Sequence, residues 1–288
     1  MKALLICPSE RDPVKLLGEG MPLCNVPLLG QSILEYWLAW LASSGVTQVS
    51  VLAHDRPEQV RAVAGQGERW GLSVDVIHES RELTPAQALL KYDEEIRPTP
   101  LQNGIAVLDH FPGMPEHPVF DSYEKCFTSL QQWMPKALTP ERVGIRELRP
   151  GIWAGLHSQI SPQAELCAPC WLGRKTFIGP RAVLGPNTII EDGCFIEGDT
   201  QIENSYVGPD TFVGRYAELS GSMAWGRTLI NWKSGSIIKV PDPFLLCALR
   251  SPARVHSGSW FSRVARVYMR NKEEVQLLWK HLLMDRES

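Results

Sequence analysis

Residues 160–202 read ISPQAELCAPCWLGRKTFIGPRAVLGPNTIIEDGCFIEGDTQI, and an aliphatic side chain recurs there at every sixth position. Neither an α-helix, with about 3.6 residues per turn, nor a β-strand, with a side-chain repeat of about two, produces that period. A strict six-residue repeat interrupted by Gly and Pro is typical of a parallel β-helix built from hexapeptide repeats. The repeating positions are Ile160, Leu166, Leu172, Ile178, Leu184, Ile190, Ile196 and Ile202.

Each hexad also has a small residue four places after the aliphatic one, as at Thr176. We expect one short strand and one corner per hexad, with the aliphatic side chain stacked inside the coil. Glycines such as Gly173 and Gly179 are expected where a side chain would crowd a corner. After Ile202 the repeat loses one residue and resumes at Val207, which predicts one tighter corner.

The overall composition of the chain argues against several classes of protein. The chain has 288 residues, with 29 Lys and Arg against 32 Asp and Glu, so no charge excess points to nucleic acid, and we expect none as a partner. No apolar run reaches the roughly 20 residues of a transmembrane segment. The opening MKALLICPSERD has too short an apolar core for a signal peptide. Together with seven scattered cysteines, these features predict a cytoplasmic protein with reduced thiols.

The CxxC pair formed by Cys167 and Cys170 has two interpretations. Such a pair can bind a metal or undergo redox chemistry, but a zinc site needs further ligands, and no second CxxC or close His supplies them. The hexad places Cys170, like Cys194, at the small inward position. We therefore favour packing inside the coil over metal binding.

The N-terminal part alternates between strand and helix patterns. Short apolar runs at 2–7, 49–54 and 72–79 are typical of buried parallel strands. Between them, residues 32–46 (SILEYWLAWLASSGV) carry apolar side chains at helical spacing behind the N-cap Ser32. This order predicts a doubly wound α/β sheet. Ligands bind such sheets at the carboxyl ends of the strands, so the loop after the first strand is the first candidate for a phosphate site.

This α/β pattern, joined to a hexapeptide β-helix, resembles the sugar-nucleotide pyrophosphorylases, also called NDP-sugar nucleotidyltransferases. The resemblance covers residues 1 to about 110 and 158–240, and is carried by MKALLI, PLLGQSILEYWLAWLASSGVTQVSVLAH, GLSVDVIHE and TPAQALLKYDEEI. It implies that the coil is a left-handed β-helix. It also implies condensation of a sugar 1-phosphate with an NTP, Mg²⁺ as the cofactor and pyrophosphate as a product.

The phosphate loop of that family, GxGTRL, is replaced here by SERDPV. Ser9 and Arg11 stand in place of glycines, and Pro13 stands in place of the family's arginine. The family's KPxLP motif falls on LCNVP, which lacks the lysine. Because glycine lets the backbone approach the phosphates closely, we expect catalysis to be impaired. Among the side chains present, Arg11 and Lys15 are the candidate catalytic residues, and Ser9 is a candidate nucleotide- or sugar-binding residue.

Two further candidates follow from later motifs of the same family. TPAQAL, residues 84–89, resembles the loop that contacts base and sugar, which implies a nucleotide- or sugar-binding role for Gln87. A position at the start of a helix explains the same residue without a ligand. IAVLDHF, residues 105–111, resembles the strand that bears the metal aspartate, which implies Asp109 as a ligand for Mg²⁺.

The limits of these patterns divide the chain into four segments. They are a truncated nucleotidyltransferase-like α/β domain at 1–118, a helical and Pro-rich connector at 119–157, the β-helix at 158–240, and a basic tail with a C-terminal helix at 241–288. In the connector, we expect Ile152, Trp153 and Leu156 to cover the open end of the coil. The sugar-binding half of the family's catalytic domain has no counterpart of comparable length.

Several functions remain open. The chain resembles a sugar-nucleotide pyrophosphorylase of nucleotide-sugar or cell-surface polysaccharide metabolism, either active or reduced to a pseudo-enzyme that binds and regulates. The alternatives are a β-helix acyltransferase and a purely structural oligomerisation subunit. Acyl transfer on such coils uses a His as general base, and no His lies between Ile160 and Val240. We expect a nucleotide sugar or sugar phosphate as a partner, and a homo-oligomer assembled through the β-helix.

Overall fold

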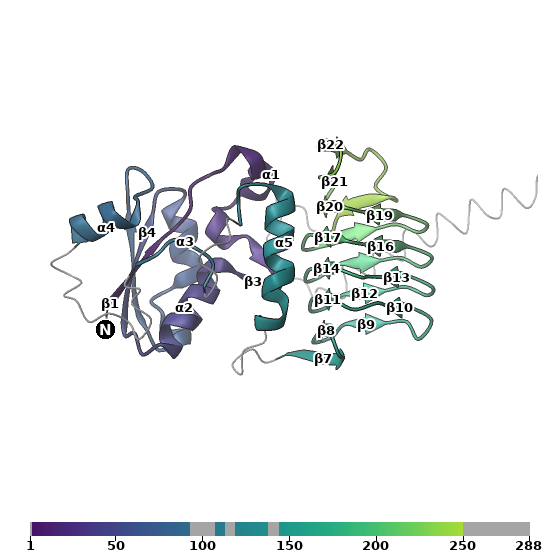
Figure 1. Ribbon diagram of the computed structural model, residues 1–288, viewed down its shortest axis with the longest axis horizontal. Coiled ribbons are helices and arrows are strands. Elements are labelled where there is room, and N and C mark those ends of the chain that lie inside the picture. The colour runs from purple at the N-terminus through teal and green to yellow at the C-terminus, as the bar shows by residue number, and fades with distance from the viewer. Residues whose placement is uncertain (1, 93–106, 113–118, 138–143, 250–288) are drawn as a thin grey trace, which may run out of the picture. The chain divides into compact units, whose positions relative to one another are not determined.

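A computed structural model describes residues 2–92, 107–112, 119–137 and 144–249 (Figure 1). The residues up to Cys247 form one compact unit, which contains both an α/β part and a β-helix. Within the described ranges, no helix is both long and apolar enough to cross a membrane. The predicted C-terminal helix and the basic tail after residue 249 lie outside the described residues.

The α/β part is built on a four-stranded parallel sheet with the order β5-β4-β1-β6. Helix α2 begins where the sequence predicts, because Ser32 Oγ accepts the Glu35 N–H while the Glu35 carboxylate accepts the Ser32 N–H. The strands are β1 (Lys2–Ile6), β4 (Gln48–Ala53), β5 (Ser73–His78) and β6 (Val107–Leu108). The helices are α1 (Lys15–Gly18), α2 (Ile33–Ser43), α3 (Pro57–Ala64) and α4 (Pro85–Tyr92), and a small hairpin joins β2 (Pro27–Leu28) to β3 (Gln31–Ser32).

Both faces of this sheet are buried, as predicted for a doubly wound arrangement. On β1, Ala3 and Leu5 face the large core that includes α2 and α3. Leu4 and Ile6 face a smaller core that Ala88 of α4 closes. The carboxyl ends of the strands are thereby held between helices on both sides, where the candidate site lies.

Helix α5 (Tyr123–Trp133) follows this sheet and begins at the N-cap Ser122, whose side chain accepts the Lys125 N–H. The ring of Phe127 stacks on Trp232 with centroids 4.8 Å apart. The predicted connector helix is therefore confirmed, and it packs against the side of the coil (Figure 1).

Three parallel sheets form the β-helix, one for each face of the coil (Figure 1). The first face holds β8 (Ile152–Gly155), β11 (Cys170–Leu172), β14 (Thr188–Ile190), β17 (Ser205–Val207) and β20 (Ser222–Trp225), and the antiparallel strands β7 (Ile145–Arg149), β21 (Thr228–Asn231) and β22 (Ser236–Lys239) extend it. The second holds β9 (Gln159–Ile160), β12 (Phe177–Ile178), β15 (Phe195–Ile196), β18 (Thr211–Val213) and β23 (Leu246–Ala248). The third holds β10 (Glu165–Leu166), β13 (Val183–Leu184), β16 (Gln201–Glu203) and β19 (Glu218–Ser220).

The register of the stacked strands confirms the hexad. Cys170 pairs with Ile152 and with Thr188, eighteen residues away on either side. Thr188 pairs with Ser205, only seventeen residues further on, so one corner absorbs the missing residue as predicted. The ladder starts at Ile152, inside the segment that we expected to be connector, so the coil begins earlier than residue 158.

The inward positions of the coil are filled as the sequence predicts. The aliphatic residues form one continuous core, and the buried threonines find carbonyl partners. Thr188 Oγ1 donates to the Ile202 carbonyl at 3.0 Å, and Thr200 Oγ1 donates to the Gly214 carbonyl at 3.1 Å. Cys170 lies in the same core, and burial raises the pKa of its thiol to about 12. The packing interpretation of the CxxC pair is therefore confirmed for Cys170, and all seven cysteines are free.

The outer side of the first face is apolar and buried, which the hexad does not predict. Its side chains share one core with α2, α3 and α5, and they are Trp153, Trp171, Ile189, Tyr206 and Met223. The prediction that Trp153 covers the open end of the coil is therefore wrong, because Trp153 packs sideways beside Trp171, with centroids 6.4 Å apart. Leu156 is exposed.

The corners are tight, and glycine serves them as predicted. A Cβ added to Gly179 would lie 2.4 Å from the Gly198 backbone N, so crowding does exclude a side chain there. The left-handed backbone conformation at the neighbouring corners falls instead on residues with side chains, at Arg181 (φ 58), Asp199 (φ 57) and Tyr216 (φ 62). These side chains project from successive coils at one corner.

Candidate functional site

A carboxylate joins two loops at the carboxyl edge of the α/β sheet. Glu82, in the loop after β5, accepts the Ser9 N–H at 2.9 Å. It also accepts both Nη groups of Arg11, at 2.7 and 2.6 Å. Arg11 in turn donates to the Ser9 carbonyl at 3.2 Å, so the loop after β1 folds around its own guanidinium. The structure thus brings Ser9 and Arg11 together, with Glu82 between them.

This contact is an ion pair at neutral pH. Burial raises the pKa of Glu82, but the bonds from Arg11 and from the Ser9 N–H outweigh it, so the pKa lies below its ordinary value. The same hydrogen bond raises the pKa of Arg11. About a third of each side chain is exposed, at 37% for Arg11 and 30% for Glu82, so solvent screens part of the attraction.

A second arginine, Arg56, holds the next part of the loop. It follows β4, and it donates to both Asp55 oxygens at 2.7 Å and to the Gly18 carbonyl at 2.9 Å. It also reaches Glu10 at 3.1 Å. Arg11 and Arg56 are therefore both neutralised by carboxylates of the chain itself.

The three other predicted site residues make different contacts. Gln87 and Thr84 bond each other's backbone N–H at the start of α4, at 3.2 and 3.3 Å. Asp109 follows β6 and contacts the His110 imidazole at 2.9 Å. Lys15 is exposed at the start of α1. Over the described ranges, no hydrogen bond or ion pair links these residues to the Arg11–Glu82 pair.

The donor set for a metal is sparse. In the part of the chain that the structure describes, no three His, Cys, Asp or Glu residues gather into a group that could hold an ion. Magnesium is commonly bound by one or two carboxylates together with substrate phosphates. Asp109 offers one carboxylate, so a magnesium site here needs phosphate oxygens of a substrate, and Mg²⁺ stays a prediction.

A second carboxylate, Glu191, is fully buried where the coil contacts the α/β part. It accepts the N–H groups of Leu29 and Gly30 and the Tyr206 hydroxyl, the last two at 2.7 and 3.2 Å. Leu29 and Gly30 form the two-residue turn of the β2–β3 hairpin, both with left-handed backbones (φ 52 and 73). A turn of this kind points neighbouring amides at one acceptor, and here the β-helix supplies that acceptor.

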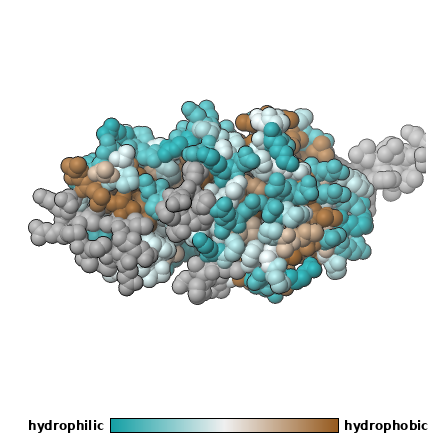
Figure 2. Space-filling model, in the orientation of Figure 1, coloured by the Kyte–Doolittle hydropathy of each residue, from teal (hydrophilic) through white to brown (hydrophobic). Residues whose placement is uncertain are grey.

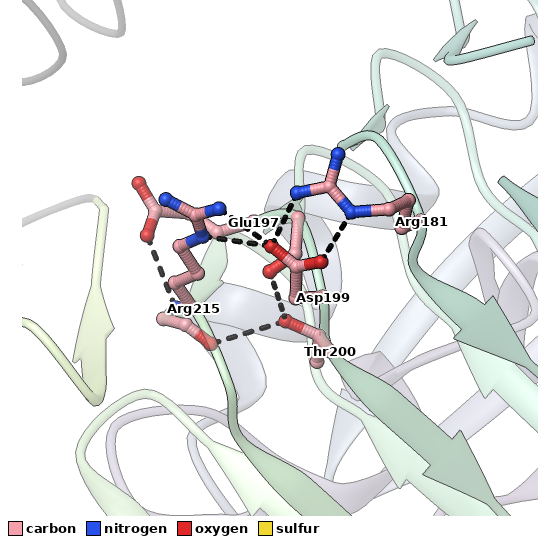
Figure 3. Close-up of polar contacts among 7 residues, drawn as sticks. Arg181, Glu197, Asp199, Thr200 and Arg215 are labelled. Carbon is pink, nitrogen blue, oxygen red and sulfur yellow. Dashed lines mark hydrogen bonds and ion pairs between the residues drawn. The ribbon is translucent and has the colours of Figure 1, made fainter. Parts of the chain in front are cut away.

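Another ion-pair network lies on the coil surface (Figure 3). Asp199 sits between Arg181, at 2.5 and 2.8 Å, and Arg215, at 2.7 Å, and the Arg215 N–H donates to Glu197. Both arginine side chains are more than half exposed. Since the three residues come from successive coils, the network ties one corner of the coil together.

A groove of about 380 Å³ lies on the third face of the coil, over β16 and β19. Its polar lining includes Gln201, Glu203, Glu218 and Ser220, and no salt bridge within the described residues engages either glutamate. The groove therefore presents hydrogen-bond acceptors and negative charge, which do not suit the phosphates of a nucleotide sugar.

Sequence reasoning missed the two carboxylates that organise these sites. Glu82 is 71 residues from Arg11, and Glu191 is 162 residues from Leu29, so no local pattern joins them. A usable signal exists for Glu191, which directly follows the inward Ile190 at the end of the buried strand β14.

The N-terminal part is similar to sugar nucleotidyltransferases. The chain is 27% identical over 90 residues to a glucose-1-phosphate thymidylyltransferase of Streptomyces griseus, covering 31% of this chain and 25% of that enzyme. The corresponding enzyme of Streptomyces antibioticus is 28% identical over 90 residues, with the same coverage. The chain thus spans about a quarter of the length of these relatives. No protein-family model matches.

Among solved structures, a match is a point mutant of perosamine N-acetyltransferase from Caulobacter crescentus, in complex with CoA and GDP-perosamine. It covers 62% of this chain and 93% of that protein, with 14% sequence identity and a TM-score of 0.21.

Proposed function

We propose that this chain is a catalytically impaired relative of the sugar-nucleotide pyrophosphorylases, which binds a nucleotide sugar or sugar phosphate without transferring a nucleotidyl group. The observation that carries the proposal is the bond from the Ser9 N–H and Arg11 to Glu82. These donors lie in the loop after β1, where an α/β sheet of this kind receives its ligand.

Loss of turnover follows from the chemistry of this loop. Nucleotidyl transfer builds negative charge at the α-phosphate, and catalysis needs donors arranged in advance around that charge. Here the Arg11 guanidinium is already bound by a carboxylate, and Ser9 carries a side chain where a close backbone approach requires glycine. Both features weaken stabilisation of the transition state more than they weaken binding of a ligand.

The test separates binding from turnover. Purified full chain is mixed with Mg²⁺, NTPs and a panel of sugar 1-phosphates, and pyrophosphate release is measured beside the S. griseus thymidylyltransferase as a positive control. The same preparation is melted with a panel of nucleotide sugars. We expect a rise in melting temperature with at least one nucleotide sugar and no pyrophosphate above the blank. Pyrophosphate release would establish an active enzyme instead, and unchanged melting temperatures across the panel would remove the binding role.

Assembly through the β-helix is part of the proposal. Several large apolar side chains of the coil region are exposed, among them Ile237, Ile238, Phe244 and Leu245. Hydrophobic residues form separate patches on the face in Figure 2, and exposed apolar patches mark association surfaces. We expect light scattering to give a mass above one chain and Ile237→Ser/Ile238→Ser to lower it. A wild-type mass of one chain would remove this part.

We also propose that the protein is cytoplasmic, where its free thiols would stay reduced.

The acyltransferase alternative is tested in the same preparation by CoA release from acetyl-CoA with an amino-sugar acceptor. We expect no release, since the coil from Ile152 to Val240 contains a single His, His157 in its first turn, and none further along that could act as the general base.

A further inference from the structure

The loop after β1 contains hydrogen-bond donors that could bind an anion, and the Glu82 carboxylate of the same chain already accepts from them. The Ser9 N–H and the Arg11 guanidinium converge within hydrogen-bond distance of one carboxylate. A backbone amide beside a guanidinium is an arrangement that binds phosphate as readily as carboxylate. Any phosphate that uses these donors has to take the place of Glu82.

We infer that Glu82 is an internal competitor at this site, so that a ligand binds the Ser9 N–H and Arg11 only by displacing the Glu82 carboxylate. The inference rests on the proposed function for the identity of the natural ligand as a nucleotide sugar or sugar phosphate. It adds that one residue of the chain sets both the affinity and the charge selectivity of the site.

The surrounding charges support displacement rather than joint binding. Arg56, which holds the next part of the loop, is bound to Asp55 and Glu10 and offers no compensation. A phosphate beside an ionised Glu82 would therefore meet a like charge within a few ångströms, and such contacts are strongly unfavourable. Diphosphates carry more charge and more acceptor oxygens than a carboxylate, so they can displace Glu82 where a simple carboxylate ligand cannot.

The substitution Glu82→Gln isolates this competition. A glutamine has the same length and can still accept the Ser9 N–H, but it no longer neutralises Arg11. The loop therefore keeps one of its contacts, and the site gains a net positive charge. Glu58→Gln is the matched control, since it also removes one negative charge and one arginine partner, Arg61, at an exposed site on α3.

The experiment measures binding of inorganic pyrophosphate by calorimetry to the full-length wild type, Glu82→Gln, Glu58→Gln and Arg11→Gln/Glu82→Gln. Melting curves verify that each variant is folded. We expect Glu82→Gln to bind pyrophosphate at least about tenfold more tightly than wild type, Glu58→Gln to match wild type, and the double variant to lose the gain. In amide NMR spectra, pyrophosphate should shift the Ser9 resonance of wild type and of Glu82→Gln.

Equal pyrophosphate affinities in wild type and Glu82→Gln, including no binding by either, would overturn the inference. A gain that survives in the double variant would overturn it as well, because Arg11 would then not be the contested donor. The nucleotide-sugar melting panel is read separately. A pyrophosphate gain without any nucleotide-sugar response supports the competitor and removes the proposed function, whereas a wild-type nucleotide-sugar response without the gain does the reverse.

Discussion

Glu191 of the β-helix accepts a 2.7 Å hydrogen bond from the amide of Gly30, which lies 161 residues earlier in the chain. The carboxylate is fully buried, and the Leu29 amide and the Tyr206 hydroxyl also donate to it. A buried charge is tolerated only when hydrogen bonds replace the water that it loses. The hairpin turn and the coil therefore fold as parts of one structure.

Replacing Glu191 by alanine should be strongly destabilising. The change leaves the buried Leu29 amide, the partly buried Gly30 amide and a hydroxyl without this acceptor, and we expect the free energy of unfolding to fall by about 3–5 kcal/mol in urea titrations. The control is Glu218→Ala, an exposed carboxylate on the same coil, which should change it by less than about 0.5 kcal/mol. Similar losses in the two variants would contradict the role of the buried contact.

Truncation of Trp171 should affect both parts of the compact unit. This fully buried side chain of the coil packs in the same core as α2 and α5. We expect Trp171→Ala to cost about 3–5 kcal/mol and to leave a single transition, followed both by circular dichroism and by fluorescence of the remaining tryptophans. Phe177→Ala, on another face of the coil, provides the comparison. Two separated transitions in wild type would show that the shared core does not couple the parts.

The pKa of Asp199 is lowered from 3.8 to about 2, first by the hydrogen bond from Arg181 and then by that from Arg215. A lowered folded-state pKa adds stability that is fully present above the unfolded value and is lost as the pH falls through the folded value. The stability advantage of wild type over Asp199→Asn should therefore be constant above about pH 4, decline from there to about pH 2, and vanish below it. Thermal melts across this range measure the advantage, and one that persists below pH 2 would refute the assignment.

Adding a methyl group at Gly179 should disturb the stacking of the coils. The new Cβ would lie 2.4 Å from the Gly198 backbone N, and backbone atoms in stacked coils cannot move independently. We expect Gly179→Ala to cost at least about 1–3 kcal/mol by urea titration. Gly18→Ala is the control, because its nearest neighbour would be a side-chain carbon at 3.7 Å. An unchanged free energy of unfolding in Gly179→Ala would contradict this prediction, because it would mean that the corner can move to accept a side chain.

The sequence predicts what depends on short-range periodicity. The hexad identified the inward positions from Ile160 onward and the lost residue after Ile202, because each coil repeats the same local geometry. The capping box at Ser32 was predictable for the same reason, since its partners lie three residues apart. Strands β1, β4 and β5 of the α/β sheet followed from their apolar runs, but β5 is not the buried strand that its run predicted, since Val76 is its one buried residue.

The sequence does not predict contacts between segments that are far apart along the chain. Trp153, Trp171, Ile189 and Tyr206 recur once per coil, at intervals of seventeen or eighteen residues that are hidden beneath the six-residue repeat. Trp153 was expected to cover the open end of the coil, and no local pattern placed the other side chains in a core shared with the helices. The Glu82 contact was not predictable from phosphate-binding motifs, because none of those motifs includes a carboxylate that accepts from the phosphate-binding donors.

The buried carboxylate also restricts how this β-helix can change in length. Repeat proteins of this kind commonly gain or lose whole coils, because each coil contacts only its neighbours. Removing the coil between Cys170 and Thr188 would preserve the stacking, but it would shift Glu191 by one strand spacing, about 4.8 Å, relative to the Gly30 amide. Insertions and deletions of whole coils between Trp153 and Glu191 should therefore not be tolerated, and one between Tyr206 and Trp232 would likewise move Trp232 away from Phe127.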